Sequence, residues 1–233
     1  QEDALVIIYF NGNIDVVKQN KIYNVNDIKR STLSSQKKIN HLRFEKNLLY
    51  LSTNFGIVVL NLTTLEITDT YSNLGPNGEM IEVLASLILK DTLYAATVKG
   101  LFAAPLNNSN LLDYNSWTRQ TVLNNTDAVN NLGILSGKLV ANSDSVFYIK
   151  GETWKELPGL KGVAKEISSM GGDLVFVMGG TGAIYLLQQN EMFRRMFIPI
   201  YGSAQSLNYD KEENCFWIGN IGNGLIKLNL SDS

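Results

Sequence analysis

Short apolar runs recur along the chain in pairs, and a polar turn separates the two runs of each pair. One clear pair is 48–51 followed by 56–60, and the last is 216–219 followed by 224–228. The apolar residues are continuous within a run instead of alternating with polar ones, as in strands that are covered on both faces. The pattern therefore predicts pairs of buried antiparallel strands joined by hairpins.

This paired pattern repeats at a nearly constant spacing. The second run of each copy begins at a glycine or a substitute for it: Asn13, Gly56, Gly100, Ser145, Gly182 and Gly224. Successive copies are 37 to 45 residues apart, and one four-stranded propeller blade has about 40 to 50 residues. We predict an all-β fold, a β-propeller of about six blades with mostly four antiparallel strands each, as a single domain over residues 1–233.

The flanking segments predict the other two strands of each blade. A shorter apolar segment precedes each pair, as at 39–44 and 163–167, and is predicted to be the inner strand. A more polar segment follows, as at 66–71 and 153–157, and is predicted to be the outer strand. The segment 80–89 could form a helix, but a strand is the preferred interpretation.

The two ends of the repeat are incomplete. Little sequence precedes the first pair, and the chain stops just after the last pair. We therefore expect the first and last sheets each to be short of a strand. The chain is predicted to be a fragment of a longer multidomain protein and part of a larger, seven-bladed ring, the alternative being a ring with two thinned blades.

Composition limits the partners. The 20 basic and 22 acidic residues leave a formal net charge of -2, which gives no overall attraction for a polyanion, so nucleic acid is not an expected partner. No apolar stretch approaches the ~20 residues that span a bilayer. We expect no transmembrane segment in this chain, and any signal peptide is expected to be removed or to lie outside it.

Residues for catalysis or metal binding are few. Zinc sites and hydrolytic triads need several histidines or cysteines, and the chain has only His41 and Cys215. His41 is predicted to be a structural residue on an inner strand, and Cys215 a buried thiol. The glycines at 179–182 open no helix, which argues against a phosphate loop, and 210–214 is typical of a charged hairpin tip. We predict no enzymatic activity, no cofactor and no metal.

Rigid turns around a propeller channel are better suited to binding. The hairpin tips between the paired strands carry five polar residues that we predict as a ligand-binding face at the channel mouth: Asn54, Lys99, Asp144, Thr181 and Asn223. Trp117 and Trp154 fall at the start of two predicted outer strands. They could stack on a sugar ring, but packing against a neighbouring strand is the preferred interpretation.

Two stretches resemble known families. Residues 216–220 and 224–226 resemble the repeat of two-component regulator propellers. The segments 9–15, 51–60, 94–102 and 110–117 together resemble the N-terminal propeller of the PorZ family, a surface component of the type IX secretion machinery of Bacteroidetes.

The PorZ resemblance implies a non-enzymatic scaffold that is exported to the cell surface or periplasm. Its partners would be protein components of a surface secretion complex, or a glycan such as lipopolysaccharide. The other resemblance implies a periplasmic glycan-sensing propeller of a hybrid two-component regulator, with a transmembrane segment and kinase downstream. A propeller lyase or glycosidase is a third hypothesis, which lacks metal ligands and a poised acid–base group.

Overall fold

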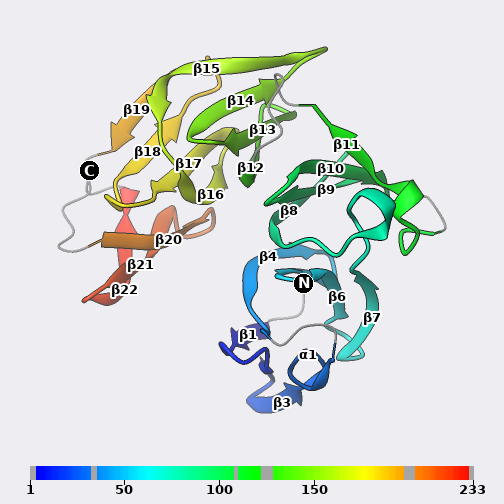
Figure 1. Cartoon of the computed structure of the whole chain (residues 1–233). Helices are drawn as coiled ribbons and strands as arrows, with labels where there is room; N and C mark the ends of the chain where they lie inside the picture. The colour runs from blue at the N-terminus through cyan, green and yellow to red at the C-terminus, as the bar shows by residue number, and fades with distance from the viewer. Residues whose placement is uncertain (1–3, 33–35, 108–109, 122–127, 197–202, 231–233) are drawn as a thin grey trace. The chain divides into compact units, whose positions relative to one another are not determined.

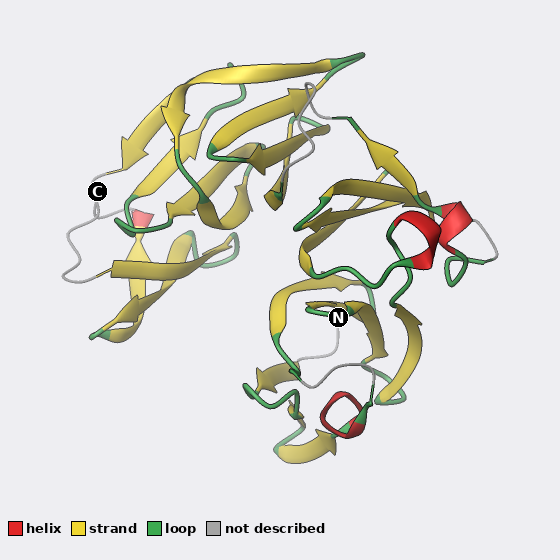
Figure 2. Ribbon diagram, in the orientation of Figure 1, coloured by secondary structure: helices red, strands yellow, loops and turns green. Residues whose placement is uncertain are grey.

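The computed structural model describes residues 4–32, 36–107, 110–121, 128–196 and 203–230. The chain forms two compact units, residues 1–120 and 121–233. Strands dominate both units, and the helices are short (Figures 1 and 2). Each unit contains three antiparallel sheets whose strands follow one another in chain order. The all-β architecture predicted from the repeat is confirmed, while the single domain over residues 1–233 stays a prediction.

Unit 1 holds the first three sheets. The first contains β1 (Ala4–Ile8), β2 (Ile14–Lys18) and β3 (Lys21–Val25). The second contains β4 (Ile39–Glu45), β5 (Leu48–Thr53), β6 (Gly56–Asn61) and β7 (Glu66–Tyr71). The third contains β8 (Val83–Leu89), β9 (Thr92–Thr97), β10 (Gly100–Pro105) and β11 (Thr118–Gln120). Of the helical turns, α1 (Asp27–Arg30) connects the first and second sheets, and η1 (Pro76–Gly78) connects the second and third. The turn η2 (Tyr114–Ser116) lies between β10 and β11 of the third sheet.

Unit 2 holds the other three sheets. The fourth contains β12 (Val129–Leu135), β13 (Lys138–Ser143), β14 (Val146–Lys150) and β15 (Trp154–Lys161). The fifth contains β16 (Ala164–Met170), β17 (Asp173–Met178), β18 (Ile184–Leu187) and β19 (Phe193–Met196). The sixth contains β20 (Ser203–Asp210), β21 (Cys215–Ile221) and β22 (Gly224–Asn229).

The first and sixth sheets have three strands each, and the other four sheets have four among the described residues. The first sheet begins with the strand pair and has no described inner strand, whereas the sixth ends with the strand pair and has no described outer strand. The prediction that both end sheets are short of a strand is therefore confirmed. The strand interpretation of 80–89 is confirmed from Val83 onward, while the helical turn α1 was not predicted.

Three of the six repeat anchors occupy matching positions in their sheets, whereas Gly182 lies in the turn before β18. Gly56 pairs with Thr53, Gly100 with Thr97 and Gly224 with Asn220, each at the start of the third blade strand. All three glycines have positive φ, and a Cβ on Gly56 would lie 2.1 Å from the carbonyl oxygen of Tyr71. Only glycine fits such a position without strain.

The cores lie between adjacent sheets. In the second sheet, Leu49, Leu51 and Val58 pack toward the first sheet, while Tyr50 and Val59 pack toward the third. Each middle strand is therefore covered on both faces. This packing is the physical reason for the continuous apolar runs in the sequence.

Candidate binding site

In both units, the turn between the two middle strands lies beside the start of the inner strand of the same sheet. The backbone N–H of Asn54 donates to the carbonyl of Lys38 at 3.2 Å. The N–H of Val98 donates to Glu82 at 3.2 Å in the third sheet, and the N–H of Gly179 donates to Val163 at 2.7 Å in the fifth. These three sheets thus each present a hairpin turn and an inner-strand start at the same end.

The structure places all five predicted binding residues in these turns. Asn54 is half-buried, while the other four are exposed: Lys99, Asp144, Thr181 and Asn223. Asn54 and Lys99 occupy matching turns of adjacent sheets in unit 1, and the other three residues belong to unit 2. Their role in binding stays a prediction.

Local contacts hold three of these side chains. The Lys99 ammonium donates to Glu79 Oε1 at 2.5 Å. The Thr181 hydroxyl oxygen accepts from the N–H of Ala183 at 3.2 Å, and Asn223 Nδ2 donates to Asn220 Oδ1 at 3.1 Å. The Thr181 and Asn223 contacts lie within their own turns, whereas Glu79, the partner of Lys99, lies in the connection between the second and third sheets.

Buried threonines fasten the turns of unit 1. Thr53 Oγ1 donates to the carbonyl of Gly56 at 3.0 Å and accepts from the N–H of Phe55 at 3.1 Å. Thr97 makes the same two contacts with Gly100 and Lys99, at 2.7 and 3.0 Å. The signal was present in the sequence, because both turns read Thr-x-x-Gly. In the sixth sheet Asn220 takes the place of the threonine.

Every described inner strand carries a register shift close to its start, and no sequence pattern predicted it. The residues skipped in the pairing are Asn40, Leu84, Asn130, Lys165 and Gln205. A bulge of this kind bends the strand and redirects nearby side chains. One extra residue in a strand leaves no clear trace in hydrophobic periodicity.

The bulged starts of adjacent sheets make contact within each unit. In unit 1, Asn40 Nδ2 donates to the carbonyl of Val83 at 2.8 Å, and Lys38 forms an ion pair with Glu82 at 3.5 Å. In unit 2, Lys165 donates to Gln205 Oε1. These polar side chains lie at the same end of the sheets as the predicted turns, so the candidate surface includes inner-strand residues that the sequence analysis missed.

Two titratable residues follow bulges at matching positions. Burial, assisted by the positive charge of Arg43, lowers the pKa of His41 to about 4. Burial raises the pKa of Glu166 to about 7, although a hydrogen bond from the Ile167 backbone acts in the opposite direction. At neutral pH His41 is uncharged, and its neighbour is a cation and not the carboxylate that orients a catalytic histidine.

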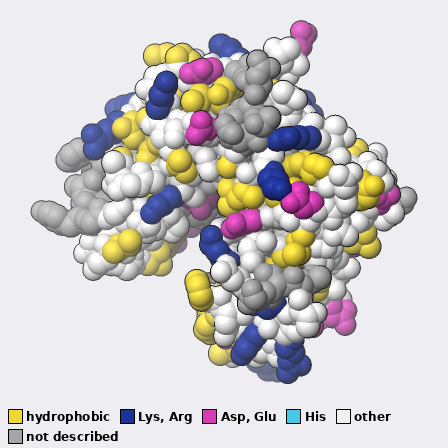
Figure 3. Space-filling model, viewed as in Figure 1, with side chains coloured by type: hydrophobic (Ala, Val, Ile, Leu, Met, Phe, Trp, Pro, Cys, Tyr) yellow, Lys and Arg dark blue, Asp and Glu magenta, His cyan; other side chains and the backbone are white. Residues whose placement is uncertain are grey.

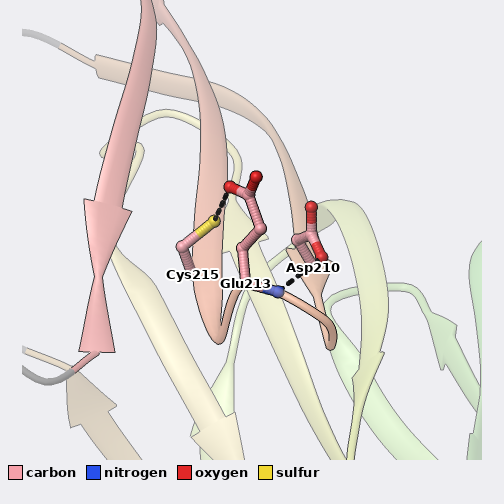
Figure 4. A group of neighbouring side chains, drawn as sticks. All are labelled: Asp210, Glu213 and Cys215. Atoms are coloured by element: carbon pink, nitrogen blue, oxygen red, sulfur yellow. Dashed lines mark hydrogen bonds between the residues drawn. The ribbon is translucent and has the colours of Figure 1, made fainter.

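Asp210, Glu213 and Cys215 form a small cluster in the hairpin before β21 (Figure 4). Their potential ligand atoms lie within 4.8 Å of one another. The Asp210 carboxylate accepts from the backbone N–H groups of Glu212 and Glu213 at 3.0 and 3.1 Å, and Glu213 pairs with the Lys227 ammonium. An acid-capped turn and an ion pair account for the cluster.

The thiol of this cluster is poorly suited to ligate a metal. Cys215 is buried, as predicted, and desolvation raises the pKa of its thiol. A metal requires the thiolate. The predicted charged hairpin tip at 210–214 is confirmed, since residues 211–214 form the turn between β20 and β21 and Asp210 ends β20.

The two tryptophans considered for sugar binding, Trp117 and Trp154, pack inside their sheets. Trp117 is 7% exposed and Trp154 is 8% exposed, and Trp117 Nε1 donates to the carbonyl of Leu111 at 3.0 Å. Neither indole presents an open face to a sugar. The packing interpretation of these residues is confirmed.

The surface carries no dominant charge on the face drawn in Figure 3, where basic and acidic side chains are interspersed. Among the residues that the structure describes, no helix has the length and apolar character needed to cross a membrane.

Comparison with known proteins agrees with this architecture. The chain superposes on PorZ of Porphyromonas gingivalis, an essential bacterial surface component of the type-IX secretion system, with a TM-score of 0.80 and 24% identity over 99% of this chain and 30% of that one. The extracellular domain of a protein assigned as a hybrid two-component system of B. thetaiotaomicron gives a TM-score of 0.67 and 16% identity, over 97% of this chain and 32% of that one. These identities establish the fold alone.

The family follows from the sequence comparison. No curated protein matches the chain, and the chain spans only 30% of the PorZ structure that it matches. The family model for the N-terminal β-propeller domain of PorZ, a component of TSS9, matches residues 1–118, which is half of the chain. This chain therefore belongs to the PorZ N-terminal β-propeller family.

Proposed function

We propose that this chain is a non-enzymatic binding scaffold of a type IX secretion machinery, exported to the bacterial surface or periplasm. The observation that carries the proposal is the family match over residues 1–118. The PorZ of P. gingivalis is described as an essential surface component of that system. By this proposal, the partners are protein components of the surface complex or a glycan such as lipopolysaccharide.

Within each unit, the binding face is proposed to be the turn end of its sheets. Three features support this choice: the side chains of the turns are mostly exposed, the turns are fastened by local hydrogen bonds, and polar inner-strand starts of adjacent sheets meet there. Rigid polar loops bind a partner at a low cost in conformational entropy. Asn54 and Lys99 in unit 1, and Asp144, Thr181 and Asn223 in unit 2, are the proposed contact residues.

The test is complementation in a bacterium that encodes the full-length protein. A deletion strain receives the wild-type gene or the charge-removing variants Lys99→Gln and Asp144→Asn, and delivery of cargo to the surface is measured by immunoblot. Matched controls are Lys46→Gln and Glu152→Gln, which remove exposed charges from the hairpins at the opposite end of the sheets. We expect the turn variants to reduce cargo delivery and the controls to restore it fully.

Two outcomes would contradict the proposal. One is full cargo delivery by the deletion strain itself. The other is turnover of a polysaccharide or peptide by the purified protein that disappears when one inner-strand residue, such as Glu166, is replaced. The glycan-sensing regulator is the less favoured alternative, because its structural neighbour shares only the fold with this chain.

A further inference from the structure

A cleft in unit 1 lies apart from the turn face. It has a volume of about 400 Å³ and lies between the outer half of the second sheet and the loop that follows β10. Its described lining includes Tyr50, Val59, Asp69, Tyr71, Asn110 and Leu111. The lining therefore combines apolar side chains with polar groups, which are two phenols and a carboxylate from the second sheet and Asn110 from the loop.

The strand register explains why the polar groups gather. Tyr50 on β5 pairs with Val59 on β6, and Val59 pairs with Asp69 on β7. Paired residues share a face of the sheet, and Tyr71 lies two residues beyond Asp69 on the same strand and the same face. Two phenols and one carboxylate are thus directed toward the third sheet.

The rings of both phenols are buried, but their hydroxyl oxygens reach the surface of the cleft. Tyr50 is 5% exposed and Tyr71 is 7% exposed. Neither hydroxyl forms a hydrogen bond with any residue in the described part of the chain. Trp117, whose ring centroid lies 6.1 Å from that of Tyr71, does have a partner for its N–H. The hydroxyls of Tyr50 and Tyr71 are therefore available to bond a ligand in the cleft.

The charges around the two phenols are negative. Burial and then the carboxylates of Glu45 and Asp69 raise the pKa of Tyr50, while burial and then Asp69 raise the pKa of Tyr71. Both phenols are therefore neutral hydrogen-bonding groups at physiological pH. No lysine or arginine is among the described lining residues, and Asp69 forms no ion pair with the described residues.

We propose that this cleft binds an organic cation, an alkylammonium or alkylguanidinium group on a short apolar stem. The Asp69 carboxylate neutralises the charge, and the hydroxyls of Tyr50 and Tyr71 accept hydrogen bonds from its N–H groups. The leucine side chains cover the stem. A sugar fits less well, because stacking needs exposed ring faces and both tyrosines are more than nine-tenths buried.

The same chemistry can come from two sources, a lysine or arginine side chain of a partner protein or a free small amine. The purified chain is titrated with butylguanidinium and butylammonium, with butanol and butyrate as controls, and binding is followed by NMR shifts of the backbone amides. For so small a ligand we expect a Kd on the order of 1–10 mM. The largest shifts are expected around Asp69 and Leu111.

Variants test the assigned contacts. Asp69→Asn keeps the shape and removes the charge, and we expect it to weaken butylguanidinium binding about 10-fold. Tyr50→Phe and Tyr71→Phe are expected to weaken it about 3-fold each, with an unchanged or higher thermal midpoint, because they remove only a hydroxyl without a partner. The matched control is Glu66→Gln, which removes an exposed charge from the same strand outside the cleft and is expected to bind as wild type.

A capped tripeptide, Gly-Arg-Gly, separates the two sources. Tighter binding of the tripeptide than of butylguanidinium assigns the cleft to a side chain of a partner protein, and weaker binding assigns it to a free amine. The proposal is overturned if butanol binds as well as butylguanidinium, if Asp69→Asn leaves the affinity unchanged, or if no probe saturates the amide shifts at concentrations on the order of 100 mM.

Discussion

The inner strands of both units contain a bulge, but the titratable residue that follows the bulge differs between them. In unit 1 the residue after the inner-strand bulge of β4 is His41, and in unit 2 the residue after the bulge of β16 is Glu166. Burial is the main cause of the pKa shift at both positions, downward for the histidine and upward for the glutamate. The bulge therefore creates a partly enclosed position, and the side chain placed there decides how the unit responds to pH.

The turns differ in a similar way. In unit 1, Gly56 lies against the backbone of Tyr71, whereas in unit 2 a Cβ on Gly224 would meet nothing within 4 Å. Matching positions in the repeat are thus under different steric restraint. The family model matches residues 1–118, almost the extent of unit 1, although unit 2 repeats the same strand pairing.

The largest expected effect on stability comes from replacing glycine in the turns, and we expect it to differ between Gly56 and Gly224. Gly56→Ala places a Cβ 2.1 Å from the Tyr71 carbonyl oxygen at a φ of 124°, and we expect it to lower the free energy of unfolding by about 3–4 kcal/mol. Gly224→Ala at a φ of 71° has open space, and we expect a loss of about 1 kcal/mol. Urea unfolding measures both, and equal losses would contradict the steric difference.

Glu166 is expected to make unit 2 less stable at neutral and alkaline pH than in acid. The pKa of the Glu166 carboxyl is about 7 in the folded chain, against a reference value of 4.5. The free energy of unfolding therefore falls as pH rises from about 4.5 to 7, because the unfolded chain releases this proton first. Glu166→Gln should raise the free energy of unfolding by about 1–3 kcal/mol at alkaline pH and leave it nearly unchanged in acid. A constant difference between variant and wild type across this range would show that Glu166 is not desolvated.

His41 is expected to have the opposite dependence in unit 1. Its pKa falls from 6.5 to about 4 on folding, so the folded chain is penalised when the histidine must bind a proton, and stability is lost as pH falls from about 6.5 to 4. His41→Gln should remove about 1–2 kcal/mol of that acid sensitivity. Unfolding curves of wild type and variant that fall in parallel between neutral and acidic pH would contradict the assignment.

Hydrophobic periodicity in the sequence was enough to predict the strands and the hairpins between them. The spacing of Gly56, Gly100 and Gly224 located equivalent hairpins, and the apolar runs located strands covered on both faces. The bulge at Asn40 was not predictable, because one skipped residue changes the register without changing the pattern.

The cleft with Tyr50 and Asp69 was also beyond prediction. Its phenols and carboxylate come from strands β5 and β7, and part of its wall comes from the loop after β10. No short motif in the sequence joins these segments. Only the packing of two sheets brings them together.

The smallest expected effect concerns the turn residues themselves. Lys99 and its partner Glu79 are both about half exposed, and Asp144 is exposed at a φ of 42°, which asparagine also adopts readily. Exposed ion pairs contribute little because water screens them. Lys99→Gln in unit 1 and Asp144→Asn in unit 2 should each change the free energy of unfolding by less than about 0.5 kcal/mol, as measured by urea unfolding. Stability-neutral variants that still reduce cargo delivery would place the defect in binding, whereas a large loss of stability in either would show that the turn has a structural role.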